Sequence, residues 1–136
     1  MRPGLFAILA TFIACADAPR PEIIYTNGNA TVRFGKDSVD LGGMPVAPKL
    51  SEYKHNKTGV LFLIEFSRGD SCPSQYLALL KNDGYKNLGE IGNCNEVKVD
   101  TSAAESIRLI FDASAEPPRK KQALKISPAG LSAFPD

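Results

Sequence analysis

The stretch GVLFLIEF, residues 59–66, decides the fold of this chain. It holds five consecutive apolar residues, Val60 to Ile64, with β-branched and aromatic side chains among them. A half-buried strand alternates apolar and polar residues, whereas a continuous apolar run of this length fits a strand buried on both faces. We therefore expect residues 59–66 to form a central strand of the core.

The stretch that follows, FSRGDSCPSQYLALLKNDGYKNLGEIGNC at residues 66–94, predicts a hairpin with a cysteine near each end. Asn82-Asp83-Gly84 has the composition of a tight turn, and residues 85–91 can pair back on residues 75–81. Residues 75–81 also suit one face of a helix, so both assignments remain open there. A strand is the preferred one because the turn follows directly.

Cys72 and Cys94 would lie side by side at the open end of this hairpin, and we expect them to form a disulfide. A redox pair usually has the spacing Cys-x-x-Cys, and Cys72-Pro73-Ser74-Gln75 lacks the second cysteine. A zinc site needs more ligands than two cysteines and His55, the single histidine, readily supply. A disulfide closing this loop would stabilise the fold by about 3 kcal/mol in the chain-entropy model.

The rest of the chain predicts further short strands, at residues 23–26, 30–34, 38–41, 97–99, 107–111 and 123–126. Residues 42–58 contain two glycines and two prolines, and they predict a long connecting loop with a short helical turn near residues 50–54. Such a loop is one candidate functional surface. The fold class we expect is all-β (β-dominated), an antiparallel meander or small sandwich of about seven or eight short strands with one disulfide.

The N-terminus, MRPGLFAILATFIACADA at residues 1–18, predicts export. One cation, Arg2, precedes an apolar run from Leu5 to Ala14, and small residues follow. This order is typical of a secretory signal peptide, and its apolar part is too short to span a bilayer. We expect residues 1–16 to be removed by cleavage after Ala16, leaving residues 17–136 as a single β-rich domain.

An alternative is a lipoprotein signal over residues 1–14. Phe12-Ile13-Ala14-Cys15 resembles a bacterial lipobox, in which the cysteine is acylated and becomes the first mature residue. Simple cleavage is preferred because Phe12 stands where the pattern usually has Leu. Either route leaves Cys72 and Cys94 as an even pair, which predicts a periplasmic or secreted protein, or an outer-membrane lipoprotein if Cys15 is lipidated.

The charge balance argues against nucleic acid as a partner. The chain has 16 basic and 15 acidic residues, and loss of Arg2 with the signal peptide leaves 15 of each. Nucleic-acid binding favours a clear basic excess.

The one basic cluster, Arg119-Lys120-Lys121 with Lys125 beyond it, offers a contact for anionic lipid or lipopolysaccharide, but a solvated loop is the preferred interpretation. Membrane contact is expected only through a lipid anchor.

Few residues predict chemistry. His55 has no nucleophile motif beside it, so we expect no catalytic residue, no cofactor and no metal. Arg68-Gly69-Asp70 is the tripeptide that integrins read, but Gly-Asp also suits a turn, and the turn is the preferred interpretation. A disulfide beside this turn would hold it rigid. The candidate partner-binding residues are Arg68, Asp70, Ser71 and Tyr76.

A wider pattern surrounds the two cysteines: Asp70-Ser71-Cys72-Pro73, then Gln75-Tyr76-Leu77, and finally Gly92-Asn93-Cys94-Asn95-Glu96. It resembles small secreted or periplasmic β-rich proteins of Gram-negative bacteria, in which a Cys-Pro-x-x-Tyr strand start and a Gly-x-Cys end bracket a hairpin. The resemblance spans residues 70–96. It implies the fold and the compartment, and the group has no settled activity.

The function predicted from these features is an exported bacterial envelope protein that binds another protein without catalysis. An inhibitor or an immunity protein that occludes a partner enzyme fits small size, export and a rigid hairpin. The alternative is a structural or accessory envelope protein, lipid-anchored at Cys15. A small hydrolase is the least favoured class.

Overall fold

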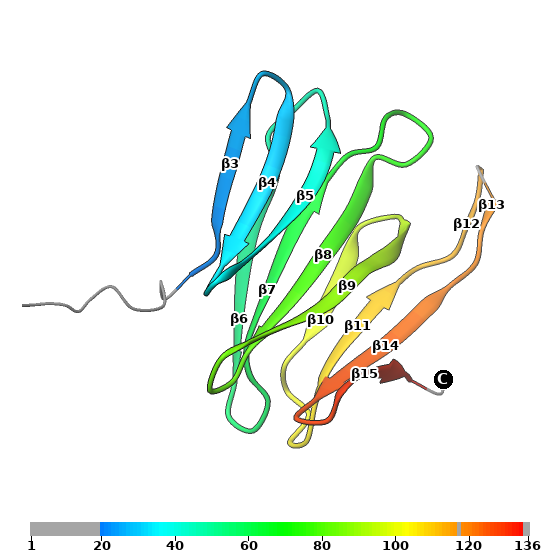
Figure 1. Ribbon diagram of the computed structural model, residues 1–136. Coiled ribbons are helices and arrows are strands. Elements are labelled where there is room, and N and C mark those ends of the chain that lie inside the picture. The colour runs from blue at the N-terminus through cyan, green and yellow to red at the C-terminus, as the bar shows by residue number, and fades with distance from the viewer. Residues whose placement is uncertain (1–19, 117, 135–136) are drawn as a thin grey trace, which may run out of the picture.

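The computed structural model describes residues 20–116 and 118–134, and every regular element in these ranges is a strand (Figure 1). The all-β prediction is confirmed. The described residues form 13 strands, more than the sequence led us to expect, in several antiparallel sheets.

Three meanders follow one another along the chain, each made of strands that pair with their neighbours in sequence. The first sheet contains β3 (Glu22–Thr26), β4 (Asn29–Phe34) and β5 (Asp37–Gly43). The second contains β6 (Lys49–His55), β7 (Gly59–Phe66), β8 (Ser74–Lys81) and β9 (Tyr85–Cys94). The third contains β10 (Val97–Asp100), β11 (Ile107–Phe111), β14 (Gln122–Ser127) and β15 (Gly130–Ala133).

A two-stranded ribbon interrupts the third sheet. It consists of β12 (Ser114–Ala115) and β13 (Pro118–Arg119), which pair with each other between β11 and β14. In Figure 1 the ribbon extends from the third sheet at the upper right of the molecule. The β11–β14 connection is therefore one long hairpin arm.

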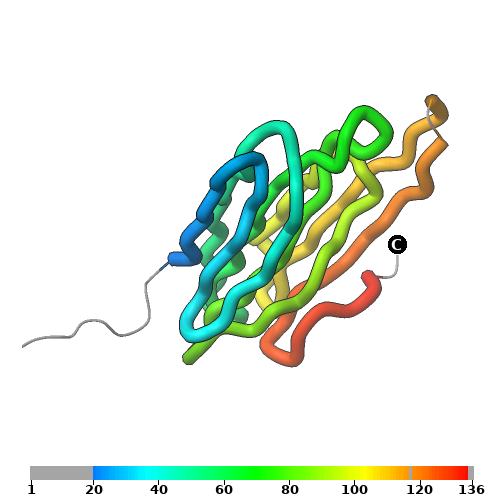
Figure 2. Tube along the Cα trace, turned by 45° about the horizontal axis from the view of Figure 1, so that its top comes forward, coloured from blue at the N-terminus to red at the C-terminus, as the bar shows by residue number. Residues whose placement is uncertain are grey.

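β7 is buried on both faces, as its continuous apolar run predicts. Phe62, Ile64 and Phe66 pack with the core residues of the first sheet, whereas Leu61 and Leu63 pack with those of the third. This division follows from the two-residue period of a strand. β8 is divided in the same way, so the second sheet is the middle layer between the other two (Figure 2).

Residues 42–58 do not form the predicted loop with a helical turn. β6 runs through Lys49–His55 and pairs with β7 along its whole length, from Lys49↔Glu65 to His55↔Gly59. Its charged residues suit an edge strand, where one side faces solvent, and they hid the strand in the sequence. The two prolines precede β6, so they do not interrupt its hydrogen bonds.

The predicted hairpin over residues 75–91 is confirmed as two strands, and the helical alternative at residues 75–81 is wrong. β8 and β9 pair from Lys81↔Tyr85 at the turn to Ser74↔Cys94 at the open end. Asp83 and Gly84 adopt positive φ angles of 65° and 140° in the turn, as a tight hairpin turn requires. β8 is thus hydrogen-bonded to β7 on one side and to β9 on the other. A helix at residues 75–81 would leave the backbone groups of both strands without these hydrogen bonds.

Candidate functional site

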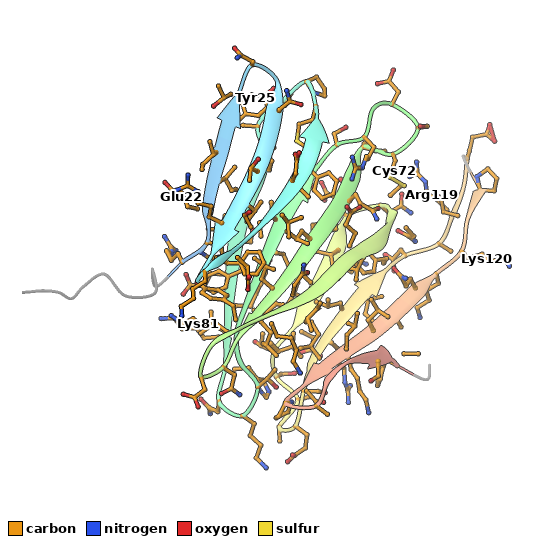
Figure 3. The ribbon with its side chains drawn as sticks, in the orientation of Figure 1. Glu22, Tyr25, Cys72, Lys81, Arg119 and Lys120 are labelled. Atoms are coloured by element: carbon orange, nitrogen blue, oxygen red, sulfur yellow. A yellow bond between two sulfur atoms is a disulfide. The ribbon has the colours of Figure 1, made fainter. Side chains whose placement is uncertain are left out.

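The candidate site lies at one end of the molecule, where segments distant in sequence meet. We call the surface formed by residues 44–48, 67–73 and 93–95 the disulfide end. Figure 3 shows Cys72 at this end, with Arg119 of the ribbon close to it. The two segments that the sequence singled out as candidate surfaces, the loop after residue 42 and the turn after residue 66, both contribute to it.

The predicted disulfide is present at this end. Cys72 and Cys94 are bonded, their Cα atoms are 4.6 Å apart, and they are separated by 22 positions in sequence. The bond joins the loop before β8 to the last residue of β9, so it closes the open end of the hairpin. A disulfide is consistent with an oxidising extracellular or periplasmic compartment.

Arg119 ties the ribbon to the disulfide. Its guanidinium donates hydrogen bonds to the backbone oxygens of Cys94 at 3.3 Å and Ser71 at 3.0 Å, and to the Asn95 side-chain oxygen. One side chain therefore holds both ends of the bridged hairpin. The sequence around Arg119 predicts only a solvated basic cluster, because nothing local relates this residue to residues 71 and 94.

Two asparagines complete the attachment of the ribbon. Asn93 Nδ2 donates to the backbone oxygens of Asp112 and Lys120, each at 2.9 Å. Asn95 Nδ2 donates to the same Asp112 oxygen at 2.8 Å. Both strands of the arm are thus fixed where they leave the third sheet. The Asn-Cys-Asn order around Cys94 was the only signal in the sequence for these contacts.

Arg68, the first candidate binding residue, is already engaged. Its guanidinium forms a salt bridge to Glu90 at 3.1 Å, donates to the Leu41 backbone oxygen at 3.1 Å, and lies 4.8 Å from the centroid of the Phe66 ring. These contacts join the first sheet to the disulfide end. Arg68 therefore orders the loop, and its charge is already paired.

Asp70 and Ser71, the next two candidates, are exposed at the tip of the loop. The loop is closed by its own backbone: Arg68 N donates to Cys72 O at 2.9 Å, and Cys72 N donates to Gly69 O at 3.1 Å. Asp70 and Ser71 therefore project from a short closed loop that the disulfide anchors. They are the candidates that a partner can reach.

Tyr76 is not part of this surface. Only 4% of the residue is exposed, its ring centroid is 5.7 Å from that of Phe111, and its hydroxyl accepts a hydrogen bond from Val97 N at 3.1 Å. Burial in this core raises the pKa of Tyr76 to about 12. The prediction that Tyr76 contacts a partner is therefore wrong: β8 directs this side chain between the second and third sheets.

An apolar groove of about 230 Å³ lies beside the tip. Its lining residues are Val46, Ala47, Lys49, Glu65, Phe66, Ser67 and Pro73. Val46 is 64% exposed, far more than any other large hydrophobic residue in the described part of the chain. Lys49 and Glu65 place one charge of each sign at the edge of the groove.

The loop that presents Val46 is anchored on both sides of Met44. The Tyr25 hydroxyl donates to Met44 O at 2.7 Å, and Met44 N donates to Gly28 O at 2.8 Å. The Met44 side chain is buried in the core of the first sheet, with 6% of the residue exposed. Because Met44, two residues earlier, is fixed inward, Val46 is held in a defined position on the surface.

His55 links two loops through hydrogen bonds of its ring nitrogens. Its Nδ1 accepts the backbone N–H of Thr58 at 3.1 Å, which leaves Nε2 to donate to Ala103 O at 2.7 Å. The ring therefore fixes the β6–β7 turn to the loop after β10. A small hollow of about 190 Å³ adjoins it, lined by His55 and the polar ends of these two loops.

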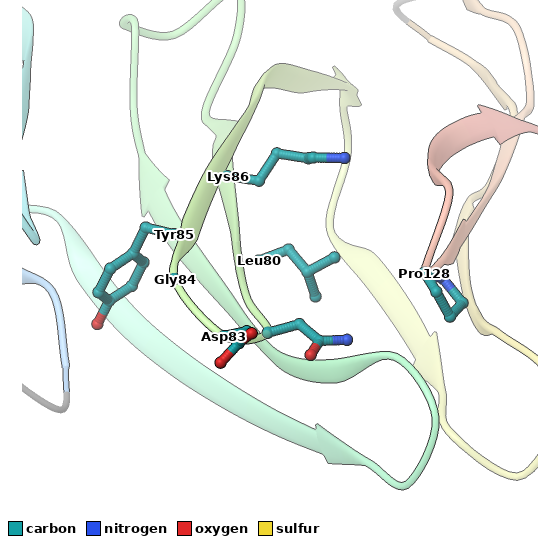
Figure 4. Close-up of a pocket in the computed structure, with 7 residues that line it drawn as sticks. Leu80, Asp83, Gly84, Tyr85, Lys86 and Pro128 are labelled. Atoms are coloured by element: carbon teal, nitrogen blue, oxygen red, sulfur yellow. The ribbon is translucent and has the colours of Figure 1, made fainter.

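A second hollow, of about 260 Å³, lies beside the β8–β9 turn (Figure 4). Its lining residues are Leu80, Asn82, Asp83, Gly84, Tyr85, Lys86 and Pro128. The lining has no histidine or cysteine, and its polar groups belong mainly to the turn.

The described residues contain no group of three or more His, Cys, Asp or Glu side chains placed to hold a metal ion. The same part of the chain has no helix that is long and apolar enough to cross a membrane. Cys15, the candidate lipidation residue, and the predicted signal peptide lie outside the described residues.

Comparisons with known proteins returned no relative. No protein family matches the chain, and neither the curated proteins nor the solved structures include a significant match.

Proposed function

We propose that this protein is an exported bacterial envelope protein that binds another protein at the disulfide end without catalysis. The observation that carries this proposal is the convergence of two anchored loops on an apolar groove, with Val46 exposed beside it. An apolar centre with a polar rim is the common anatomy of a protein–protein contact. Asp70 and Ser71 supply exposed polar groups in the loop whose two ends, Ser67 and Pro73, line the groove.

Rigidity of the surface supports the same proposal. The disulfide, the Arg68 contacts and the Arg119 hydrogen bonds each hold the loop at residues 67–73 from a different side. A surface ordered before binding loses little conformational entropy when a partner docks. Occlusion of a partner, as by an inhibitor or an immunity protein, is the role that a small rigid surface suits.

Export is the second part of the proposal. The secretory signal at residues 1–16 and the disulfide agree with a periplasmic or secreted location, in line with the resemblance to small β-rich proteins of Gram-negative bacteria. The lipobox-like Phe12-Ile13-Ala14-Cys15 supports an alternative, an accessory envelope protein held at the outer membrane by lipid on Cys15. Mass spectrometry of the mature N-terminus distinguishes the two, because only the alternative predicts acylated Cys15.

The test of binding is affinity capture with three forms of the purified protein: wild type, Val46→Asp and Ala129→Asp. Ala129 is exposed in the β14–β15 turn, at the end of the molecule opposite the disulfide end in Figure 1. Both variants place the same new charge on an exposed apolar residue. We expect one protein to be retained stoichiometrically by wild type and Ala129→Asp, and to be lost from Val46→Asp.

Retention by all three forms would place the partner elsewhere on the surface and overturn the assignment of the groove. If wild type retained no protein at all, the accessory-envelope alternative would be favoured, and the role of the protein would then be expected to depend on Cys15.

A further inference from the structure

The outer face of the third sheet carries a pair of cations on neighbouring strands. Ile107, Leu109 and Phe111 are fully buried, so the residues that alternate with them on β11 face away from the core. Arg108 is one of these residues, and its register partner on β14 is Lys125. Register partners share a face, so the two cationic side chains are neighbours on the outer surface.

This arrangement has an electrostatic cost. Directly opposite side chains of an antiparallel pair have Cβ atoms about 5 Å apart, and like charges there destabilise a sheet. Among the described residues, neither Arg108 nor Lys125 forms an ion pair. The nearby Lys98 is different, since its ammonium lies 2.7 Å from the Asp112 carboxylate.

Asp100 does not neutralise the pair. It is the register partner of Arg108 on the other side, but its Oδ1 accepts hydrogen bonds from Ser102 N at 2.9 Å and Ser102 Oγ at 2.6 Å. These hydrogen bonds, with a smaller effect of the Arg108 charge, lower the pKa of Asp100. Asp100 is a single carboxylate that already accepts two hydrogen bonds from Ser102, so it does not balance the charges of both Arg108 and Lys125.

A second observation is that the fold does not satisfy every donor of the Arg108 guanidinium. Nε of Arg108 is buried, and it has no hydrogen-bond partner among the described residues. Its guanidinium carbon lies 4.6 Å from the centroid of the Phe134 ring, and Phe134 is held to β14 by a hydrogen bond from its N–H to Ala123 O at 2.9 Å. The ring therefore packs against the guanidinium. Because the buried Nε is out of reach of a ligand, the Nη groups are the donors that an anion at this face could use.

We infer that Arg108 and Lys125 form a binding site for a dianionic phosphate group. A guanidinium binds phosphate through two parallel N–H donors, and a lysine ammonium adds a point charge. A dianion neutralises both cations, whereas a carboxylate neutralises one. The site lies on the outer face of the third sheet and does not depend on the proposed binding at the disulfide end.

The phosphate has two possible sources, a soluble phosphomonoester or a phosphomonoester headgroup on a membrane. Inorganic phosphate serves as the probe for the first. Vesicles of phosphatidylcholine with and without phosphatidic acid serve for the second, because the phosphatidic acid headgroup is a phosphomonoester.

The test titrates each probe into ¹⁵N-labelled protein at constant ionic strength and follows the backbone amides of residues 108 and 125. The variants are Arg108→Gln and Lys125→Gln, with Arg33→Gln as the matched control. Arg33 is an exposed arginine on β4 with Glu22 as its register partner, 3.8 Å away. All three substitutions remove one positive charge and keep a polar side chain.

We expect saturable shifts at residues 108 and 125, weakened at least tenfold by either site variant and unchanged in Arg33→Gln. Saturation by inorganic phosphate assigns a soluble ligand. Binding that needs phosphatidic acid vesicles and Arg108, without saturation by inorganic phosphate, assigns a membrane headgroup. The site is overturned if neither probe saturates, or if Arg108→Gln and Arg33→Gln bind equally.

A thermal melt provides an independent readout. Without phosphate, Lys125→Gln is expected to unfold at a higher temperature than wild type, because it removes the like-charge contact. Added phosphate is expected to raise the unfolding temperature of wild type more than that of Lys125→Gln. Equal shifts in the two proteins would contradict the site.

Discussion

The surroundings of a single side chain decide its role in this protein, and Tyr76 and Arg68 illustrate it. Both are polar residues near the cysteines, and both read as contact residues in the sequence. Tyr76 lies on the face of β8 that packs on the third sheet and is buried against Phe111. Arg68 is exposed, yet its guanidinium is occupied by Glu90 and Leu41 O. Of the candidate residues, only Asp70 and Ser71 are exposed without being committed in this way.

The raised pKa of Tyr76 predicts a loss of stability at high pH. The folded protein holds the phenol proton up to about pH 12, whereas an unfolded tyrosine loses it near pH 10. The free energy of unfolding should therefore keep this contribution below about pH 10, fall between about pH 10 and 12, and then level off. The total loss is expected to be about 2–3 kcal/mol.

The measurement compares urea unfolding of wild type, Tyr76→Phe and Tyr25→Phe across this pH range. Tyr76→Phe removes the titrating group, so its stability should fall less steeply than that of wild type. Tyr25→Phe, which removes the hydroxyl that donates to Met44 O, shows how much of the alkaline loss comes from a different tyrosine. Equal slopes for all three proteins would show that Tyr76 does not govern the alkaline loss.

Among the elements, the turns set how closely neighbouring strands approach. Gly59 begins β7 with a φ of 112°, and a Cβ added there would lie 2.4 Å from the Lys81 backbone oxygen. Gly69 has the same φ of 112°, but a Cβ added there would meet no atom within 4 Å. Both positions need a positive φ, but only Gly59 also lacks room for a side chain. Comparing the two therefore distinguishes the cost of the backbone conformation from the cost of close packing against the end of β8.

Alanine at these two glycines is expected to have unequal effects. Gly69→Ala should cost about 1–2 kcal/mol, the strain of a left-handed conformation with a side chain. Gly59→Ala should cost about 1–3 kcal/mol more, because β7 or the β8–β9 turn must also move. Urea unfolding of both variants measures the difference. Equal losses in the free energy of unfolding would mean that the backbone at Lys81 moves away from the new Cβ at no measurable cost.

At the scale of the whole molecule, three meanders stack into layers, and the disulfide end is where their connections meet. Each strand of the three large sheets pairs with neighbours in its own meander. Contacts between meanders are therefore made by side chains. They include the two cores on either face of the second sheet and hydrogen bonds such as those of Arg68 and Arg119. Arg68 lies in the same loop as Cys72, and Arg119 donates a hydrogen bond to Ser71 of that loop.

Loss of the disulfide is expected to lower the free energy of unfolding by about 3 kcal/mol. The variant is Cys72→Ser with Cys94→Ser, measured by urea unfolding beside wild type with and without a reducing agent. Reduction should destabilise wild type to the level of the double variant and leave the double variant unchanged. A double variant as stable as oxidised wild type would show that the side-chain contacts alone hold this end.

The sequence by itself determined the all-β class, the doubly buried strand at residues 59–66 and the pairing of Cys72 with Cys94. These features depend on local patterns: a continuous apolar run, tight-turn residues and an even cysteine count. The site was only partly predictable. The sequence located the loop at residues 67–73, but it read Tyr76 as a contact and Arg119 as solvated.

Only the tertiary structure decided that Lys49–His55 is a strand, that Val46 lies beside the disulfide loop, and that Arg108 faces Lys125. Each of these depends on strand register or on packing between layers. Register follows from which face of each strand finds apolar cover, and that cover comes from residues distant in sequence. The charged edge strand and the paired cations therefore have no local signature, since their neighbours are set by the stacking of the three meanders.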